Sequence, residues 1–330
     1  MKKRNIAVIS GGDSGEHEIS IKSGREVSKA IDQERYNVYP LVIRGKDWYY
    51  KSPEHKKNFI NKNDFSLTIE GERILFDVVF NAIHGTPGED GKLQGYFDML
   101  KIPYTSCNHE VSALTFHKGF CNQTVRSFAL DDLKIADSIL LVGDDLFDEK
   151  EIIDRIGLPC FVKAVKSGSS VGVYKAKKPE DIPITIEAAF EVCDEIMIEK
   201  FVKGRELTCG VSDFGKIIKT WPLAEIISKR EFFDFTAKYD ATLNQEIIPA
   251  PVSEELSRRI KNISKILYHK LRCEGIVRFD YIVTESEDIY FLEVNTVPGM
   301  TNESIVPKMV QSEGISLKDF YTMLIENALK

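Results

Sequence analysis

The chain has 330 residues, of which 43% are hydrophobic and 29% charged, and its formal net charge is −7. This composition is typical of a soluble globular protein of about two domains and excludes a disordered or collagen-like chain. The acidic balance argues against nucleic acid or an anionic membrane as partner, because phosphate groups select basic surfaces. The six cysteines lack zinc-site spacing, so we expect free thiols in the cytoplasm. The first apolar run, residues 6–9, is too short for a signal peptide or a membrane helix.

The chain opens with a predicted strand, a glycine turn and a helix. Residues 6–9 are apolar, Ser-Gly-Gly-Asp-Ser-Gly follows, and a helix is expected from about Glu16. This order is typical of a dinucleotide-binding fold, but the glycines do not have the spacing G-x-G-x-x-G. Taken alone, the turn fits a structural role as well as a ligand site. Glu16 would also suit the positive end of the helix dipole.

Two more strands are expected in the first third of the chain, at residues 37–43 and 74–82. The second is continuously apolar, as is usual for a parallel strand covered on both faces. It runs into His84-Gly-Thr-Pro-Gly-Glu-Asp-Gly and then a helix with Leu93 and Phe97 on one side. Loops at the carboxyl ends of parallel strands bind ligands in open sheets, although a single histidine there is more often structural. No function is assigned to the polar segment 44–71.

The middle of the chain carries lysines in unusual places. A helix capped by Asn108 and running to residue 128 is expected to contain Lys118, and Lys163 lies in an apolar strand at residues 160–165. A buried charge of this kind needs a partner. The small-residue loop 166–172 that follows has amides able to surround phosphate oxygens, although it is not the P-loop G-x-x-x-x-G-K-[ST]. A strand at residues 195–202 and a meander over residues 207–227 come next.

Residues 228–251 contain aromatic side chains without a clear period. A segment of this length without its own secondary structure favours an active-site lid. It includes Lys238 and Tyr239. A helix over residues 253–273 is expected to follow it.

Two strands near the end of the chain, residues 277–283 and 290–295, are predicted to form a hairpin with one polar and one apolar face. Alternation places Phe279 and Tyr281 on the apolar face, together with Leu292 and Val294 of the second strand. The polar face is then made of Arg278, Asp280, Glu293 and Asn295. Two carboxylates and an amide oxygen suit Mg²⁺ better than zinc or copper. A hairpin exposed to water could carry the same face, but the small-residue loop 298–304 that follows favours a site.

Arg278-Phe-Asp, Glu293-Val-Asn-Thr-Val-Pro-Gly-Met-Thr and Ser304 resemble the metal and substrate hairpin of D-alanine–D-alanine ligases, ATP-grasp enzymes of bacterial cell-wall synthesis. The opening turn, the His84 loop and the loop 166–172 extend the resemblance over nearly the whole chain. It implies an α/β fold with a Rossmann-like (pre-ATP-grasp) N-terminal domain and a two-lobed α+β ATP-grasp domain. We place the N-terminal domain at residues 1–106, the central lobe at 107–200 and the C-terminal lobe at 201–330.

The resemblance implies that ATP activates one D-alanine as an acyl phosphate, which the amine of a second D-alanine attacks. The expected cofactors are ATP and two Mg²⁺ ions, for which Mn²⁺ can substitute, and the expected assembly is a cytoplasmic homodimer. The implied catalytic residues are Glu16, Ser169, Tyr239, Arg278 and the amide of Gly299. The implied substrate-binding residues are His84, Lys238 and Ser304. The implied ATP-binding residues are Lys118, Lys163, Glu199, Lys200, Val202, Glu206 and Lys238. The implied metal ligands are Asp280, Glu293 and Asn295.

Three alternatives remain at the level of sequence. A ligase of the same fold could join D-alanine to D-lactate or D-serine. A nicotinamide oxidoreductase would require the glycine fingerprint that the opening turn lacks. A nucleotide-binding module without catalysis would be expected to have lost metal ligands or the arginine, and all of these are present. The sequence departs from the family pattern at Thr86-Pro87 and at Ile305.

Overall fold

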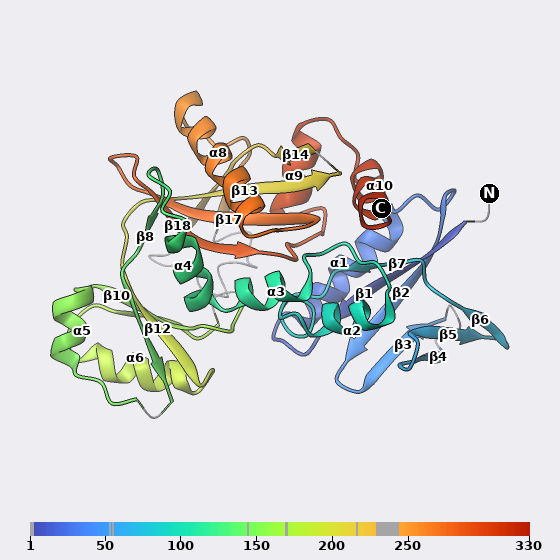
Figure 1. The fold of residues 1–330 in the computed structure, drawn as a ribbon, viewed down its shortest axis with the longest axis horizontal. Helices are drawn as coiled ribbons and strands as arrows, with labels where there is room; N and C mark the ends of the chain where they lie inside the picture. The colour runs from blue at the N-terminus through green and yellow to red at the C-terminus, as the bar shows by residue number, and fades with distance from the viewer. Residues whose placement is uncertain are drawn as a thin grey trace.

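The structure is a computed structural model that describes residues 3–52, 54, 56–143, 145–168, 171–215, 217–228 and 244–330. The described chain forms three sheets, two of seven strands and one of four, arranged as three adjoining bodies (Figure 1). The predicted lid and the residues Ser169, Lys238 and Tyr239 lie outside the described residues. The domain boundaries at residues 106 and 200 stay predictions.

The N-terminal sheet has the strand order β6-β5-β4-β3-β2-β1-β7. Its parallel part consists of β1 (Arg4–Gly11), β2 (Tyr36–Arg44) and β7 (Val78–Asn81), of which β1 and β2 confirm the strands predicted at residues 6–9 and 37–43. The predicted helices are also present, as α1 (His17–Ala30) and α2 (Lys92–Leu100). Both ligand-loop candidates, the turn after β1 and the His84 loop after β7, therefore leave the sheet at the same edge.

An antiparallel ribbon extends this sheet, mostly within the polar segment to which no function was assigned. Its strands are β3 (Asp47–Lys51), β4 (Lys57–Asn61), β5 (Ser66–Ile69) and β6 (Glu72–Ile74). The predicted single strand over residues 74–82 is wrong, because Ile74 belongs to β6 while β7 begins at Val78. Between them the chain turns from the ribbon back to β1, where Asp77 accepts a hydrogen bond from the Asn5 amide at 2.7 Å.

The four-stranded sheet is antiparallel and has the order β11-β10-β12-β9. Its strands are β9 (Ser138–Val142), β10 (Cys160–Ala164), β11 (Val173–Ala176) and β12 (Glu195–Lys200). The helices α5 (Glu149–Ile156) and α6 (Asp181–Phe190) pack beside it, and their isoleucines share one core cluster with the strands (Figure 1). The loop 166–172 joins β10 to β11, as predicted.

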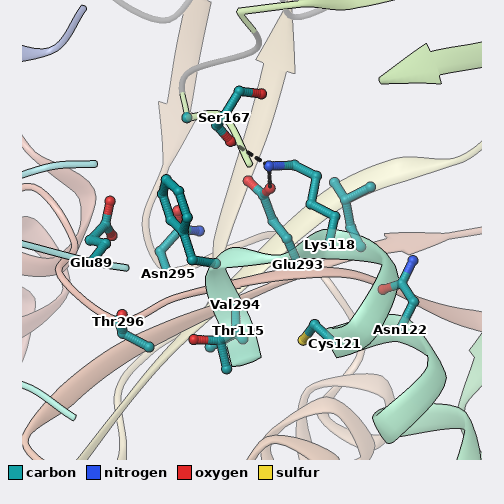
Figure 2. Close-up of a pocket in the computed structure, with 13 residues that line it drawn as sticks. Glu89, Thr115, Lys118, Cys121, Asn122, Ser167, Glu293, Val294, Asn295 and Thr296 are labelled. Atoms are coloured by element: carbon teal, nitrogen blue, oxygen red, sulfur yellow. Dashed lines mark hydrogen bonds and ion pairs between the residues drawn. The ribbon is translucent and has the colours of Figure 1, made fainter. Parts of the chain in front are cut away.

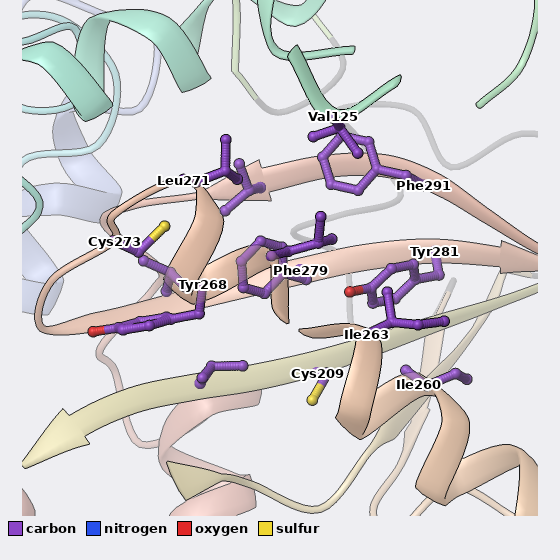
Figure 3. Packing of buried hydrophobic residues seen from close by; sticks show 14 of the residues in the cluster. Val125, Cys209, Ile260, Ile263, Tyr268, Leu271, Cys273, Phe279, Tyr281 and Phe291 are labelled. Carbon is purple, nitrogen blue, oxygen red and sulfur yellow. The ribbon is translucent and has the colours of Figure 1, made fainter. Parts of the chain in front are cut away.

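The C-terminal sheet contains the predicted hairpin at its centre, in the order β16-β15-β13-β17-β18-β8 with β14 paired to β13. Its strands are β8 (Lys134–Ile135), β13 (Arg205–Phe214), β14 (Ile217–Thr220), β15 (Ala224–Ser228), β16 (Asn244–Ile247), β17 (Ile276–Val283) and β18 (Ile289–Asn295). One core cluster joins β13, β17 and β18 to α3 (His109–Phe116), α4 (Lys118–Ser127) and α8 (Glu254–Lys270) (Figure 3). No helix of the described residues is long and apolar enough to cross a membrane.

The single helix predicted over residues 108–128 is wrong, because the chain breaks into α3 and α4 at His117. This residue has an extended backbone (φ −89°, ψ 97°), and its ring accepts a hydrogen bond from the Phe120 amide at 3.2 Å. The break frees the Lys118 amide, which donates instead to the Val165 carbonyl at 3.0 Å. Lys118 is therefore the first residue of a helix and is tied to the end of β10.

The last two helices, α9 (Ile305–Ser312) and α10 (Leu317–Ala328), share a core with the N-terminal sheet. The rings of Phe80 on β7 and Tyr321 on α10 lie 5.5 Å apart in an edge-on contact. The Tyr36 hydroxyl donates to Glu326 at 2.5 Å. The N-terminal sheet is thus packed directly against the part of the chain that follows the hairpin (Figure 1).

Candidate active site

The hairpin pairs the predicted polar residues across its two strands. Asp280 lies opposite Glu293 and Arg278 lies opposite Asn295, while Phe279 and Tyr281 are fully buried in the core (Figure 3). The register shifts between Asp280 and Tyr281, which is the mark of a β-bulge. The prediction that Leu292 faces the apolar core is wrong, because the shift places it at the wall of the pocket beside Glu293.

Asp280 is the most fully bonded carboxylate of this face, with an exposed fraction of 2%. Arg278 donates to both of its oxygens at 2.8 Å. Thr208 donates to the first oxygen at 2.5 Å and Asn295 to the second at 2.9 Å. Burial alone would lower the pKa of Arg278, but the Asp280 carboxylate keeps that pKa above its usual value. Arg278 is therefore a fixed cation in this site.

A pocket lies between this hairpin and the start of α4 (Figure 2). The ammonium of Lys118 donates to the Ser167 carbonyl at 2.5 Å and lies 3.6 Å from a carboxylate oxygen of Glu293. Lys118 therefore connects the phosphate-loop candidate to the hairpin. The pocket is lined by Glu89, Thr115, Phe116, Lys118, Cys121, Asn122, Ser167, Gly168, Leu292, Glu293, Val294, Asn295 and Thr296.

Lys163 has the partner that its place in an apolar strand requires. Its ammonium forms an ion pair with Glu199 of the neighbouring strand β12, and both side chains are buried. Glu199 was predicted to be an ATP-binding residue, which stays a prediction. The side chain of Glu199 is now seen to fix the position of Lys163.

Glu16 lies between two glycines from different bodies of the molecule. A Cβ atom added to Gly168 would lie 2.4 Å from a Glu16 carboxylate oxygen, and one added to Gly85 would lie 3.8 Å away. Gly168 must therefore lack a side chain for Glu16 to keep its place. The opening turn, the His84 loop and the loop 166–172 meet at this carboxylate.

We expect Gly168→Ala to fold normally and to bind the first substrate poorly. The clash is with the end of a flexible side chain, so Glu16 is displaced and the backbone is spared. Losing one hydrogen bond to a charged group corresponds to about a tenfold rise in KM or more. Steady-state kinetics on D-alanine measures this rise. The control is Gly95→Ala, where the nearest atom is a His109 carbon at 3.9 Å, and an unchanged KM in Gly168→Ala would contradict the placement of Glu16.

His84 and Glu89 together hold the main chain of Val297, just beyond the hairpin. One ring nitrogen of His84 lies 2.9 Å from the Val297 carbonyl and the other 3.1 Å from the Ser23 hydroxyl. Glu89 accepts from the Val297 amide at 3.2 Å and from the Gly85 amide at 2.6 Å. Burial lowers the pKa of His84, which favours the neutral ring. The sequence analysis missed Glu89, although it stands in the His84 motif.

The environment of Glu89 predicts how the stability of the fold depends on pH. Burial, followed by the neighbouring charge of Glu16, raises the pKa of Glu89 from 4.5 to about 8. The folded protein then binds a proton more tightly than the unfolded chain between these two values, so stability falls as pH rises through this interval and levels off above it. The upper limit is about 1.4 kcal/mol for each pH unit. Melting temperatures from pH 5 to 9 should show this fall in the wild type and a smaller one in Glu89→Gln; parallel curves would contradict the raised pKa.

The loop after the hairpin places Gly299 against Ser304. The Ser304 hydroxyl accepts from the Thr301 amide at 3.1 Å, and a Cβ atom on Gly299 would lie 2.7 Å from the same oxygen. Because the loop begins at Val297, the contacts of His84 and Glu89 also fix the position of the Gly299 amide. The roles of Gly299 and Ser304 toward a substrate stay predictions.

The remaining predicted nucleotide residues lie along the junction of the four-stranded and C-terminal sheets. Lys200 ends β12, its amide donates to the Asp137 carbonyl at 2.9 Å, and its side chain is exposed. Val202 lies in the connection to β13, where Glu206 pairs with Ile226 and Ile282 of the adjoining strands. The structure brings Lys118, Glu293 and Asn295 into one pocket, whereas Lys200, Val202 and Glu206 do not line it.

The donor set on the hairpin fits a hard divalent cation. Asp280 and Glu293 are cross-strand partners, and Asn295, whose amide nitrogen donates to Asp280, also has an amide oxygen. All three present oxygen, which Mg²⁺ prefers. Within the described ranges no group of three or more His, Cys, Asp or Glu side chains is placed to hold a metal, so a site here relies on Asn295 as well as the two carboxylates.

Comparisons with known proteins agree over nearly the entire chain. Residues 5–107 match the family model described as D-ala D-ala ligase N-terminus, and residues 130–326 match D-ala D-ala ligase C-terminus. The D-alanine–D-alanine ligase of Phocaeicola vulgatus is 46% identical over 326 residues, which are 98% of this chain and 99% of the relative.

Solved structures give the same result. The VanG D-Ala:D-Ser ligase of Enterococcus faecalis has a TM-score of 0.86 at 30% identity, covering 99% of this chain and 100% of that one. The Bacillus anthracis D-alanine–D-alanine ligase complexed with ATP has a TM-score of 0.80 at 31% identity, covering 100% and 98%. The predicted α/β fold of the ATP-grasp type is confirmed, and the oxidoreductase alternative is set aside. With both of its parts matched by the family models, the chain belongs to the D-alanine–D-alanine ligase family of ATP-dependent ligases.

Proposed function

We propose that the chain joins two D-alanines to D-alanyl-D-alanine with ATP, giving ADP and phosphate, as a step toward peptidoglycan precursors. The observation that carries the proposal is the meeting of Lys118, Glu293 and the phosphate-loop candidate in one pocket, with Glu16 against Gly168. A nucleotide phosphate and an amino acid can therefore be held at the same place. The proposed setting is the cytoplasm, and the proposed assembly is a homodimer.

The reaction needs two steps because a carboxylate does not react with an amine unaided. A carboxylate oxygen of the first D-alanine attacks the γ-phosphorus of ATP, and the bond to ADP breaks, giving an acyl phosphate. The amine of the second D-alanine then attacks the acyl carbon and loses a proton, and the C–O bond to phosphate breaks. Negative charge develops on the phosphoryl oxygens in the first step and on the carbonyl oxygen in the second.

The residues of the site are proposed to act on these two charges. Lys118 and Lys163 would bind phosphate oxygens. Arg278, held by Asp280, and the Gly299 amide would donate to the carbonyl oxygen; one such donor is typically worth about 3–4 kcal/mol in the transition state. Glu16 would orient the ammonium of the first amino acid, and Ser304 would bind the carboxylate of the second. Lys238, Tyr239 and Ser169 keep their proposed roles outside the described residues.

Asp280, Glu293 and Asn295 would hold Mg²⁺. The bound ions would neutralise phosphate charge during transfer. In the described protein Asp280 is already bonded to Arg278, so its oxygens are fixed on the polar face of the hairpin. Lys118 adds a further positive charge 3.6 Å from Glu293.

The test is phosphate release from ATP with single amino acids and with pairs. We expect release with D-alanine alone and none with L-alanine. Mass spectrometry of the products then separates the alternatives: D-alanyl-D-alanine supports the proposal, whereas a preference for D-serine or D-lactate beside D-alanine would replace it with a ligase of that second substrate. Light scattering on the purified chain tests the homodimer.

Isotope labelling tests the mechanism. With ¹⁸O in the carboxylate of D-alanine, the first step predicts that one labelled oxygen leaves with phosphate in each turnover. The product phosphate should therefore carry ¹⁸O. Unlabelled phosphate accompanied by normal dipeptide formation would mean that no acyl phosphate forms.

A further inference from the structure

Three buried polar side chains from different elements form a bonded group next to the pocket. Lys163 on β10, Glu199 on β12 and Asn122 on α4 have exposed fractions of 8%, 4% and 3%. One oxygen of Glu199 pairs with the Lys163 ammonium, and the other accepts from the Asn122 amide nitrogen at 3.2 Å. Each oxygen of this buried carboxylate thus has its own donor.

Asn122 connects this group to the pocket. It lines the pocket with Lys118, which stands four residues earlier on α4 (Figure 2). Residues four apart lie on the same face of a helix. One face of α4 therefore carries both Lys118 and Asn122. Lys118 itself lines the pocket, and Asn122 is linked to Lys163 through Glu199.

The orientation of the Asn122 amide is set by the charge of Glu199. The opposite orientation would place an amide oxygen against a carboxylate oxygen, so the nitrogen must face Glu199. The amide oxygen is then buried without a hydrogen-bond partner among the described residues. A buried polar atom left in this state is unfavourable, and a residue kept only for packing would be apolar. The N–H group that the amide donates to Glu199 therefore explains why position 122 carries a polar residue.

Resting on the proposed function, we propose that Asn122 is a positioning residue for ATP: it fixes the Glu199 carboxylate and thereby holds Lys163 at a set distance from Lys118. A glutamate whose carboxylate is bonded at only one oxygen can rotate about its side-chain bonds. The ammonium of the lysine paired with it then moves as well. Two lysines that bind neighbouring phosphates must keep their spacing before ATP arrives. Asn122 supplies this preorganisation without touching the reacting atoms.

Two variants separate the hydrogen bond from the space it occupies. Asn122→Asp has the same shape but sets two carboxylates face to face, and Asn122→Leu removes only the donor. We expect the Kd of ATP, measured by calorimetry without D-alanine, to rise about 10- to 100-fold in Asn122→Asp and about tenfold in Asn122→Leu. The KM of ATP should rise in parallel, while the KM of D-alanine changes less than about threefold.

A double variant tests the direct contact between Asn122 and Glu199. In the double variant Asn122→Asp with Glu199→Gln, the amide and the carboxylate exchange places, and the net charge of the group is kept. We expect this variant to bind ATP at least about threefold more tightly than Asn122→Asp alone, because the two sites are directly coupled. Independent, additive losses in the double variant would overturn the proposed contact.

Asn5→Asp is the matched control. The Asn5 amide nitrogen donates to the Leu75 carbonyl at 2.9 Å in the N-terminal sheet, so the same substitution there damages a hydrogen bond away from the pocket. If Asn122→Asp lowers the melting temperature as Asn5→Asp does and leaves the Kd of ATP unchanged, the residue is structural and the inference fails. A wild-type chain that does not bind ATP would also overturn it. A wild type that binds ATP through Asn122 but forms no dipeptide would leave the inference standing and reject the proposed function.

Discussion

Replacing Glu293 by glutamine is expected to lower kcat at least about a hundredfold while leaving the fold intact, because the change removes a negative charge proposed to hold the cations on the phosphates. Glu293 lies opposite Asp280 on the hairpin and 3.6 Å from Lys118, so the substitution removes one of the two proposed carboxylate ligands and the negative charge that faces Lys118. Glutamine keeps the size of the side chain. Phosphate release at saturating ATP and D-alanine, over a series of Mg²⁺ concentrations, measures the loss.

Glu313→Gln is the control for this change. Glu313 also pairs with a single lysine, Lys219, at 2.5 Å, but the pair lies on the surface beside α9. Its replacement should leave kcat unchanged, since exposed ion pairs contribute about 0–1 kcal/mol. Normal turnover by Glu293→Gln at high Mg²⁺, with an unaltered melting temperature, would remove Glu293 from the proposed metal site.

Arg278→Met is expected to reduce both stability and activity. The substitution leaves Asp280, with a side chain only 3% exposed, without the cation that binds both of its oxygens. Breaking a buried ion pair from one side typically costs about 3–5 kcal/mol. If Arg278 also stabilises the carbonyl oxygen, kcat should fall by about 10²–10³-fold. Arg278→Lys keeps the charge without the two-pronged contact, so it should recover more stability than activity.

Arg259→Met shows what an exposed pair of the same kind contributes. Arg259 also makes a two-pronged contact, to Asp132 at 2.5 and 2.9 Å, but the Asp132 side chain is 46% exposed. Chemical denaturation of both variants should give a loss of about 1 kcal/mol or less for Arg259→Met. Equal losses of stability in the two variants would mean that water still reaches Asp280.

Local patterns in the sequence were sufficient for much of this site. Alternation along residues 277–283 predicted that Arg278 and Asp280 share a face opposite Phe279 and Tyr281, because successive side chains of a strand point to opposite sides. The charge at Lys163 in an apolar strand predicted a buried partner. The N-cap residue Asn108 correctly marked a helix start, where its side chain accepts the Val111 amide.

Features that depend on contacts between residues far apart in the sequence could not be predicted from local patterns. The break at His117 involves neither proline nor glycine, and it is accompanied by a bond from the Lys118 amide to the Val165 carbonyl, just beyond the end of β10. The bulge that turns Leu292 into the pocket depends on the register of two strands. The contact between the His84 ring and the Val297 carbonyl joins residues 213 positions apart, and no local sequence pattern predicts such a pair.

The packing of α10 on the N-terminal sheet has a consequence for how the chain is made. The contact between Tyr36 and Glu326 joins residues 290 positions apart, so the first sheet leaves the ribosome long before the helix that covers it. Until then the apolar side chains of β1 and β7 that share a core with α10 lack the part of their cover that α10 supplies. Emerging segments with exposed apolar surface are the ones that chaperones protect and that aggregate when they are delayed. Packing of the first body of the enzyme therefore cannot be completed until α10 has been synthesised.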